Sequence, residues 1–306
     1  MGLQHVIVSQ QFTVPVLLEL FERTRAMERI VARGGTLDYQ NRLMATLFYQ
    51  PSTRTRISFE AAMHRLGGRV CSTEQARAFS SEVEGEQLED TIRIISEYVD
   101  VIVLRHLEPG GAARAAAVSR VPIINAGDGS GGQHPTQALL DLYTIFRERR
   151  TLEGLSIAMV GELDQGRTVR SLAYLLSKFD RVKMYFVSPV EVRMKPDILE
   201  HLEKHDVWHT QETELDRVIG NADVIYMTQI HPGRMTDQHR LRKYFMDAAV
   251  LRKMRPNAMI LHPLPRTVEL DKAVDDDPRA FYFQQAKNGL YVRMALLAMV
   301  LDSRSS

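Results

Sequence analysis

Short apolar runs alternate along the chain with longer stretches whose apolar positions recur at helical spacing. In the first half, this pattern predicts strand and helix pairs at 43–49 and 53–66, 99–104 and 110–118, and 121–125 and 134–147. After residue 151 the alternation restarts, with segments at 155–163, 166–179, 182–187, 197–205, 224–228 and 259–261. Repeated β–α units are typical of parallel sheets with helices on both faces, so we predict an α/β fold of two doubly wound parallel-sheet domains.

The length of 306 residues also favours two hydrophobic cores over one. A charged stretch around 149–154 ends one long helical pattern just before the next buried strand. We therefore expect a first domain over 1–149 and a second over 150–287. The apolar helical pattern at the end of the chain, about 288–306, is expected to complete the first domain.

Composition narrows the class of partner. The chain has 39 Lys and Arg against 38 Asp and Glu, which gives no electrostatic reason to expect nucleic acid or a membrane surface as partner. Cys71 is the only cysteine, which excludes an intrachain disulfide, and no Cys/His cluster has the spacing of a metal site. Because the sequence also shows no secretory signal pattern and no run of 18 apolar residues, we expect a cytoplasmic protein without metal or membrane partner.

The segment 51–56, Pro-Ser-Thr-Arg-Thr-Arg, stands between a predicted strand and a predicted amphipathic helix. Ligands of open α/β sheets bind beyond the carboxyl ends of the strands, where the next helix offers free N–H groups and the positive end of its dipole. Ser52, Thr53, Arg54 and Thr55 are therefore candidates for binding a phosphate, with Arg54 adding a bidentate cation. The alternative is an ordinary Ser/Thr helix cap followed by two solvated arginines.

Two further motifs of the first half follow predicted strands. Arg105 comes directly after the strand predicted at 99–104, where it can reach a phosphate or carbonyl oxygen; the alternative is a surface arginine. His134 and Gln137 open a helix after a glycine-rich turn and can donate hydrogen bonds to a polarised carbonyl oxygen. A histidine in this position is otherwise structural.

In the second half, Gly161 to Thr168 follows the first predicted strand but lacks the G-x-G-x-x-G spacing of a dinucleotide-binding loop. We interpret Arg167 as a carboxylate-binding residue. The segment 262–266, His-Pro-Leu-Pro-Arg, ends another strand, and its two prolines stiffen a turn whose carbonyls can accept hydrogen bonds from an amino group.

These motifs together resemble the aspartate and ornithine carbamoyltransferase family, and its aspartate branch in particular, along essentially the whole chain. The resemblance implies carbamoyl transfer from carbamoyl phosphate to an amino acceptor, aspartate by default, in pyrimidine biosynthesis and without a cofactor. It also implies a homotrimer with shared active sites. Whether a regulatory chain or a dihydroorotase chain binds this protein stays an open question.

The resemblance assigns roles residue by residue. Ser52, Thr53, Arg54 and Thr55 would hold the phosphate, and Arg105, His134 and Gln137 the carbamoyl group, with backbone groups near Leu264. Four of these are the expected catalytic residues: Arg54, Thr55, Arg105 and His134. Arg167 would bind an acceptor carboxylate, and Gln229, His231 and Pro265 would complete the acceptor site.

Two positions depart from the aspartate branch. Glu84 stands where that branch carries a lysine, on a loop around Ser80 that reaches the neighbouring subunit, and Gln229 replaces a carboxylate-binding arginine. Losing a charged partner of a buried carboxylate costs roughly 2 to 5 kcal/mol. Three explanations of these departures therefore stay open: a less anionic acceptor, a binding or assembly role without catalysis, and compensation by a nearby lysine or arginine from another loop.

Overall fold

The computed structural model describes residues 3–74, 85–234 and 238–303. The chain forms two compact units, one of Met1–Leu139 with Asn288–Ser306 and the other of Leu140–Lys287. The helices α6 and α10 each continue from one unit into the other. The domain limits expected from the sequence, 1–149 with about 288–306 and 150–287, are kept as a prediction.

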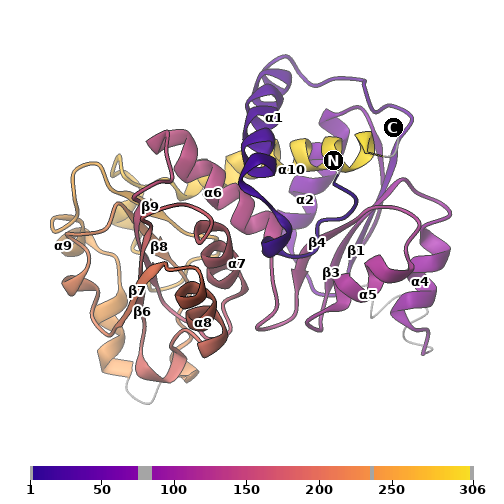
Figure 1. Cartoon of the computed structure of the whole chain (residues 1–306). Coiled ribbons are helices and arrows are strands. Elements are labelled where there is room, and N and C mark those ends of the chain that lie inside the picture. Colours follow the sequence, from indigo (N-terminus) through magenta and orange to yellow (C-terminus); the bar gives the residue numbers. More distant parts are fainter. Residues whose placement is uncertain (1–2, 75–84, 235–237, 304–306) are drawn as a thin grey trace. The chain divides into compact units, whose positions relative to one another are not determined.

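The first unit contains a four-stranded parallel sheet in the order β2-β1-β3-β4. Figure 1 labels β1, β3 and β4 of this sheet. The elements of this unit are α1 (Val14–Ala32), β1 (Leu43–Phe48), α2 (Thr53–Arg65), β2 (Arg69–Glu74), α4 (Leu88–Ile95), β3 (Val101–His106), α5 (Gly111–Val118), β4 (Ile123–Asp128), the start of α6 (Pro135–Arg149) and most of α10 (Tyr282–Asp302).

Both faces of this sheet are covered. Alternate strand residues such as Leu47 and Leu104 form one hydrophobic cluster with Ile92 of α4 and Ala115 of α5. On α2, Phe59 is fully buried, and the Arg293 guanidinium of α10 lies 5.1 Å from the centre of its ring. The side chains of β1, β3 and β4 are therefore buried on both sides, as expected for a parallel sheet.

The second unit contains a five-stranded parallel sheet in the order β7-β6-β5-β8-β9. Its elements are β5 (Ser156–Val160), α7 (Arg167–Leu176), β6 (Lys183–Val187), α8 (Pro196–Lys204), β7 (Trp208–Glu212), β8 (Val224–Met227), α9 (Ala248–Leu251) and β9 (Met259–Leu261). Short 3-10 helices in the two units cover Ser9–Gln11, Val190–Val192, Leu215–Arg217, Pro232–Arg234, Gln238–Tyr244 and Lys272–Val274.

These sheets confirm the predicted fold class of two doubly wound parallel-sheet domains. In each sheet the strand order reverses once, between β1 and β3 in the first unit and between β5 and β8 in the second. Neighbouring strands at such a switch point send their following helices to opposite faces, which leaves a crevice beyond their carboxyl ends. The topology therefore directs the search for a site to the segments after β1, β3, β5 and β8.

The edge strands β2 and β7 and the helices α1 and α4 were not predicted. Two sequence expectations were wrong in detail. The strand β3 extends to His106, so Arg105 lies inside the strand and not after it. The helix predicted from His134 begins at Pro135, so His134 precedes its first turn. Among the described helices, none is long and apolar enough to cross a bilayer.

Candidate active site

At the switch point of the first unit, the strand register brings the candidate motifs to one edge of the sheet. Phe48, the last residue of β1, pairs with Arg105 of β3, and the Tyr49 amide donates to the Arg105 carbonyl at 2.9 Å. On the other side of β3, His106 pairs with Asp128 at the end of β4. The segments after β1 and β4 therefore both begin beside the end of β3.

Ser52 is the N-cap residue of α2, with an extended backbone and no hydrogen bond from its side chain to the helix. The first intrahelical bond is donated by the Arg56 amide to the Ser52 carbonyl at 3.1 Å. The backbone N–H groups of residues 53–55 have no acceptor within the helix, as is the case at every helix start. Within the described parts of the chain, the side chains of Ser52, Thr53, Arg54 and Thr55 form no hydrogen bond or ion pair.

The two arginines of this motif behave differently. Arg56 donates from one guanidinium nitrogen to Glu60 at 3.2 Å and to Ser72 at 3.1 Å. Arg54 is exposed, yet surrounding protein atoms partly desolvate its guanidinium and lower its pKa. Because no carboxylate of the described chain neutralises it, Arg54 leaves a positive charge at the start of α2, where a helix already favours an anion.

Arg105 and His134 are both buried, at 9% and 4% relative exposure, although both are polar. Arg105 donates to the carbonyl of Ala126 at 3.3 Å, and the His134 Nδ1 lies 3.4 Å from the hydroxyl of Thr136. Gln137 is half-buried on the first turn of α6. The structure thus places the expected carbamoyl-binding residues on segments at the carboxyl edge of the sheet.

Other residues of the same motifs serve the fold. The His106 Nδ1 accepts the Glu108 amide at 3.1 Å, and the Asp128 carboxylate accepts the amides of Gly110 and Ala112, each at 3.2 Å. Asp128 thereby caps α5. These contacts explain why two polar side chains are buried at this edge without being candidates for substrate binding.

At the switch point of the second unit, β5 and β8 approach very closely at their ends. Gly161 has φ +129°, and a side chain there would clash with the Thr228 hydroxyl. Arg167, half-buried, is the first residue of α7, and Gln229 is half-buried just after β8. His231 is exposed two residues further on. Three of the acceptor residues expected from the sequence, Arg167, Gln229 and His231, therefore lie on the two segments that leave this switch point, whereas Pro265 follows β9.

Two acidic residues that the sequence analysis missed, Glu162 and Asp164, link the segment after β5 to the segment after β8. The Glu162 carboxylate accepts the His231 amide at 2.5 Å and the Arg234 guanidinium at 2.9 Å, and the His231 Nδ1 lies 3.1 Å from it. Asp164 accepts both amino groups of Arg234, at 3.2 and 2.7 Å. Burial tends to lower the pKa of Arg234, but the hydrogen bond with Asp164 is the largest effect, and the net pKa is raised.

Arg234 is the arginine nearest in sequence to Gln229, and it is committed to two carboxylates. It therefore adds no uncompensated positive charge beside Gln229. Seventy residues separate Arg234 from Asp164 along the chain, so no periodic pattern in the sequence indicated the pair.

The segment after β9 carries the last group of candidates. Leu264 has φ +55°, the left-handed region, and its amide donates to the His262 Nδ1 at 2.8 Å. Pro265 is exposed. Arg266 pairs with Asp275, with one of the two contacts at 2.7 Å. The His262 side chain thus holds the amide of Leu264, and Arg266 is held by Asp275.

Comparison with known proteins fits this geometry. The family model described as "Aspartate/ornithine carbamoyltransferase, carbamoyl-P binding domain" matches residues 4–147, and the one described as "Aspartate/ornithine carbamoyltransferase, Asp/Orn binding domain" matches residues 153–300. The chain belongs to the aspartate/ornithine carbamoyltransferase family.

Two curated relatives show how far the similarity extends. The chain is 53% identical over 310 residues to the chloroplastic aspartate carbamoyltransferase of Oryza sativa, covering 98% of this chain and 85% of the relative. It is 45% identical over 303 residues to the aspartate carbamoyltransferase catalytic subunit of Methanocaldococcus jannaschii, covering 98% of each.

Solved structures of the family agree with the fold. The catalytic subunit of M. jannaschii aspartate transcarbamoylase superposes with a TM-score of 0.91 at 44% identity, covering 99% of this chain and 100% of that one. The Trypanosoma cruzi enzyme in complex with carbamoyl phosphate and aspartate superposes with a TM-score of 0.91 at 38% identity, covering 97% and 95%.

Two site residues expected from the sequence, Ser80 and Glu84, lie outside the described residues. Glu84 therefore stays a sequence prediction. Among the described residues, no group of three or more His, Cys, Asp or Glu side chains is arranged to hold a metal ion.

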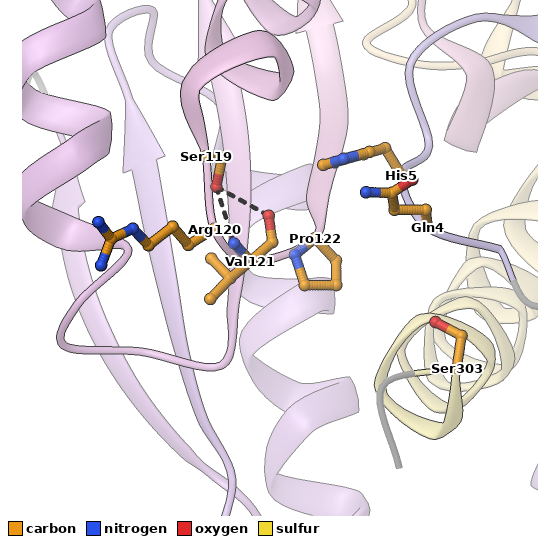
Figure 2. Close-up of a pocket in the computed structure, with 7 residues that line it drawn as sticks. All are labelled: Gln4, His5, Ser119, Arg120, Val121, Pro122 and Ser303. Atoms are coloured by element: carbon orange, nitrogen blue, oxygen red, sulfur yellow. Dashed lines mark hydrogen bonds between the residues drawn. The ribbon is translucent and has the colours of Figure 1, made fainter. Parts of the chain in front are cut away.

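A cavity of about 340 Å³ opens at a different place in the first unit of this carbamoyltransferase, beside the segment that enters β4 (Figure 2). It is lined by polar groups that are already bonded. The Ser119 hydroxyl donates to the Val121 carbonyl at 2.8 Å, the His5 Nδ1 accepts the Ile123 amide at 3.1 Å, and the Ser303 hydroxyl donates to the Val300 carbonyl at 2.9 Å. Because the cavity lies at the amino ends of the strands, we do not assign the reaction to it.

Proposed function

We propose that this protein transfers the carbamoyl group of carbamoyl phosphate to the amino group of aspartate. The observation that carries the proposal is the start of α2, where the hydroxyl groups of Ser52, Thr53 and Thr55 and the cationic guanidinium of Arg54 have no partner in the described chain. A phosphate would accept hydrogen bonds from these groups and from the free amides of the helix start. Relatives and solved neighbours named aspartate carbamoyltransferase or transcarbamoylase support the choice of reaction.

The proposed reaction is a single acyl-type transfer. The amino nitrogen of aspartate attacks the carbamoyl carbon, a C–N bond forms, and the bond from that carbon to the phosphate oxygen breaks. The departing phosphate takes a proton from the attacking nitrogen, which yields N-carbamoyl-aspartate and inorganic phosphate. No metal or organic cofactor enters this mechanism.

The side chains supply position and charge. We assign the phosphate to Ser52, Thr53, Arg54 and Thr55. Negative charge that develops on the carbamoyl oxygen is stabilised by donors placed in advance, the function we assign to Arg105 and His134, with Gln137 beside them. Holding both substrates in line for attack supplies the rest of the rate enhancement.

The acceptor is assigned to the second unit. Arg167 binds one carboxylate, and Gln229, His231 and the backbone at Leu264 and Pro265 complete the contacts. Gln229 offers hydrogen bonds without charge, so the second carboxylate of aspartate is bound less strongly here than by an arginine. We therefore expect a high KM for aspartate.

A second candidate function follows from the same segment. Because Arg234 is already paired with Glu162 and Asp164, the described residues near Gln229 carry no excess positive charge. This arrangement favours an amino acceptor with one carboxylate and a neutral or cationic remainder. The reaction would otherwise be unchanged.

We further propose that the protein assembles as a homotrimer with shared active sites. Two relatives are named as catalytic subunits, which supports an oligomeric assembly. Light scattering on the purified chain tests this directly. A mass three times that of one chain supports the proposal, and a monomer contradicts it.

The two candidate functions are separated by one assay. The purified chain is incubated with carbamoyl phosphate and either aspartate or a panel of less anionic amines, and both phosphate and carbamoylated product are measured. Equal amounts of phosphate and N-carbamoyl-aspartate support the first function. Product with another amine, and none with aspartate, supports the second.

A further inference from the structure

His262, the residue that follows β9, uses both ring nitrogens within the protein. Its Nδ1 accepts the amide of Leu264 at 2.8 Å, and its Nε2 lies 3.0 Å from the Glu269 carboxylate. The side chains of His262 and Glu269 are 1% and 0% exposed. Neither can touch a substrate, so any effect they have on the reaction must pass through the backbone.

The hydrogen bonds define where the imidazole carries its proton. An amide N–H can only donate, so Nδ1 must present its lone pair to Leu264. The ring proton therefore sits on Nε2 and points at Glu269, and the ring is neutral. Glu269 fixes both the tautomer and the orientation of the ring.

Glu269 is itself held in place. One carboxylate oxygen also accepts the Thr267 amide at 2.9 Å, and the other accepts the Thr267 hydroxyl at 2.5 Å. Burial raises the pKa of Glu269, but the hydrogen bonds from His262 and Thr267 outweigh burial and the net pKa is lowered. The carboxylate thus stays ionised, as its role as acceptor of these bonds requires.

The bond to His262 acts on an unusual backbone position. Leu264 has φ +55°, a conformation that residues other than glycine adopt only when surrounding contacts impose it. The His262 backbone amide in turn donates to the Gln285 side chain at 2.9 Å, which also holds the backbone from which the imidazole ring extends. The orientation of the carbonyls at 263 and 264 follows from this arrangement.

We propose that His262 and Glu269 are positioning residues, which lock the backbone of 263–265 in the conformation that meets the amino acceptor. The inference rests on the proposed function, in which this backbone completes the acceptor contacts. It assigns a role in the reaction to two side chains that lie outside the substrate-binding set.

Two substitutions of the same residue separate positioning from structural support. In His262→Asn, the amide oxygen takes the place of Nδ1 and still accepts the Leu264 amide, but the contact with Glu269 is lost. In His262→Gln, the longer side chain reaches Glu269 but no longer presents an acceptor to Leu264. The alternative is that His262 only supplies a hydrogen bond to the buried Glu269 carboxylate. In that case the His262→Gln variant should be both more stable and more active than the His262→Asn variant.

The measurement is kcat and the KM for aspartate, together with the thermal unfolding midpoint of each variant. We expect kcat/KM for aspartate to be about tenfold higher in the Asn variant than in the Gln variant, roughly the effect of one hydrogen bond at the loop. This order should hold even where the Gln variant is the more stable protein. An equal or reversed order in kcat/KM overturns the inference.

A failure of the proposed function can be distinguished from a failure of this inference. If the wild-type chain forms no N-carbamoyl-aspartate, the proposed function is wrong, and the two variants are then ranked by calorimetric binding of aspartate. Binding that is equal in both variants, or absent from the wild type, overturns the inference as well.

Discussion

Arg54 and Arg56 lie two positions apart on the first turns of α2, and the structure uses them differently. Arg56 donates to Glu60 at 3.2 Å, whereas Arg54 has no acceptor among the described residues. One arginine supports the protein and the other is left for an anion. This contrast supplies a matched pair of variants.

We expect Arg54→Ala to weaken carbamoyl phosphate binding by roughly 30- to 1,000-fold, because a charged hydrogen-bonding partner contributes about 2–4 kcal/mol. Its free energy of unfolding should stay within about 0.5 kcal/mol of the wild type, since the side chain forms no hydrogen bond or ion pair with the described residues. Calorimetric titration and urea unfolding measure the two quantities.

The control is Arg56→Ala, which removes the bonds to Glu60 and Ser72. It should lower the free energy of unfolding by about 1 kcal/mol and change carbamoyl phosphate affinity less than Arg54→Ala does. The same loss of affinity in both variants would contradict the assignment of the phosphate to Arg54.

Gln229→Arg is expected to lower the KM for aspartate by about tenfold or more, because it returns a charged partner to the second carboxylate. The KM for carbamoyl phosphate should not change. Steady-state kinetics with each substrate varied in turn measures both. Gln229→Asn is the neutral control, and an equal improvement in that variant would show that charge is not the cause.

Arg234→Ala should destabilise the protein by about 2 kcal/mol. The change leaves Glu162 and Asp164, whose side chains are 11% and 13% exposed, without their shared cation. Lys253→Ala is the control in the same unit, because its ion pair with Asp216 is about half exposed and should contribute less than about 0.5 kcal/mol. Equal losses in the two variants would show that the Glu162 and Asp164 contacts add nothing.

Asp275 gives an expected pH dependence. The hydrogen bond from Arg266 is the largest influence and holds the Asp275 pKa below its ordinary value of 3.8. A carboxylate with a lowered pKa in the folded state adds stability above its unfolded pKa and loses it as the pH falls through the folded pKa.

We therefore expect Asp275→Asn to be less stable than the wild type at pH 7 and to lose less stability on acidification below about pH 4. Urea unfolding between pH 2 and pH 7 measures this difference. Asp276→Asn is the control, because Asp276 has no ion pair among the described residues. Parallel pH curves for Asp275→Asn and the wild type would contradict the assignment.

Several elements with a local pattern were predicted from the sequence, although the helices α1 and α4 were missed. The strand and helix around Ser52 were placed to within one residue, because a buried apolar run meets an amphipathic helix there. The edge strands β2 and β7 were missed, since their sequences, Arg-Val-Cys-Ser-Thr-Glu and Trp-His-Thr-Gln-Glu, carry no apolar run. A strand at the edge of a sheet has a neighbouring strand on one side only and is more open to solvent, so fewer of its side chains need to be apolar.

The contacts that set the candidate site are mostly non-local. Arg234 meets Asp164 only because β5 and β8 are neighbours in the sheet, and the sequence does not show this neighbourhood. His262 and Glu269 are seven residues apart in a segment without helical or strand periodicity, so their pairing also depends on the folded loop. The residue types at the strand ends were visible in the sequence, whereas their partners required the structure.

The most direct test of the account is the time course of phosphate and N-carbamoyl-aspartate from the purified wild-type protein, supplied with carbamoyl phosphate and aspartate. We predict equal amounts of the two products, a high KM for aspartate, and loss of both products in Arg54→Ala. Phosphate release without carbamoyl-aspartate, or no release with any amine tested, would contradict the proposed transfer to aspartate.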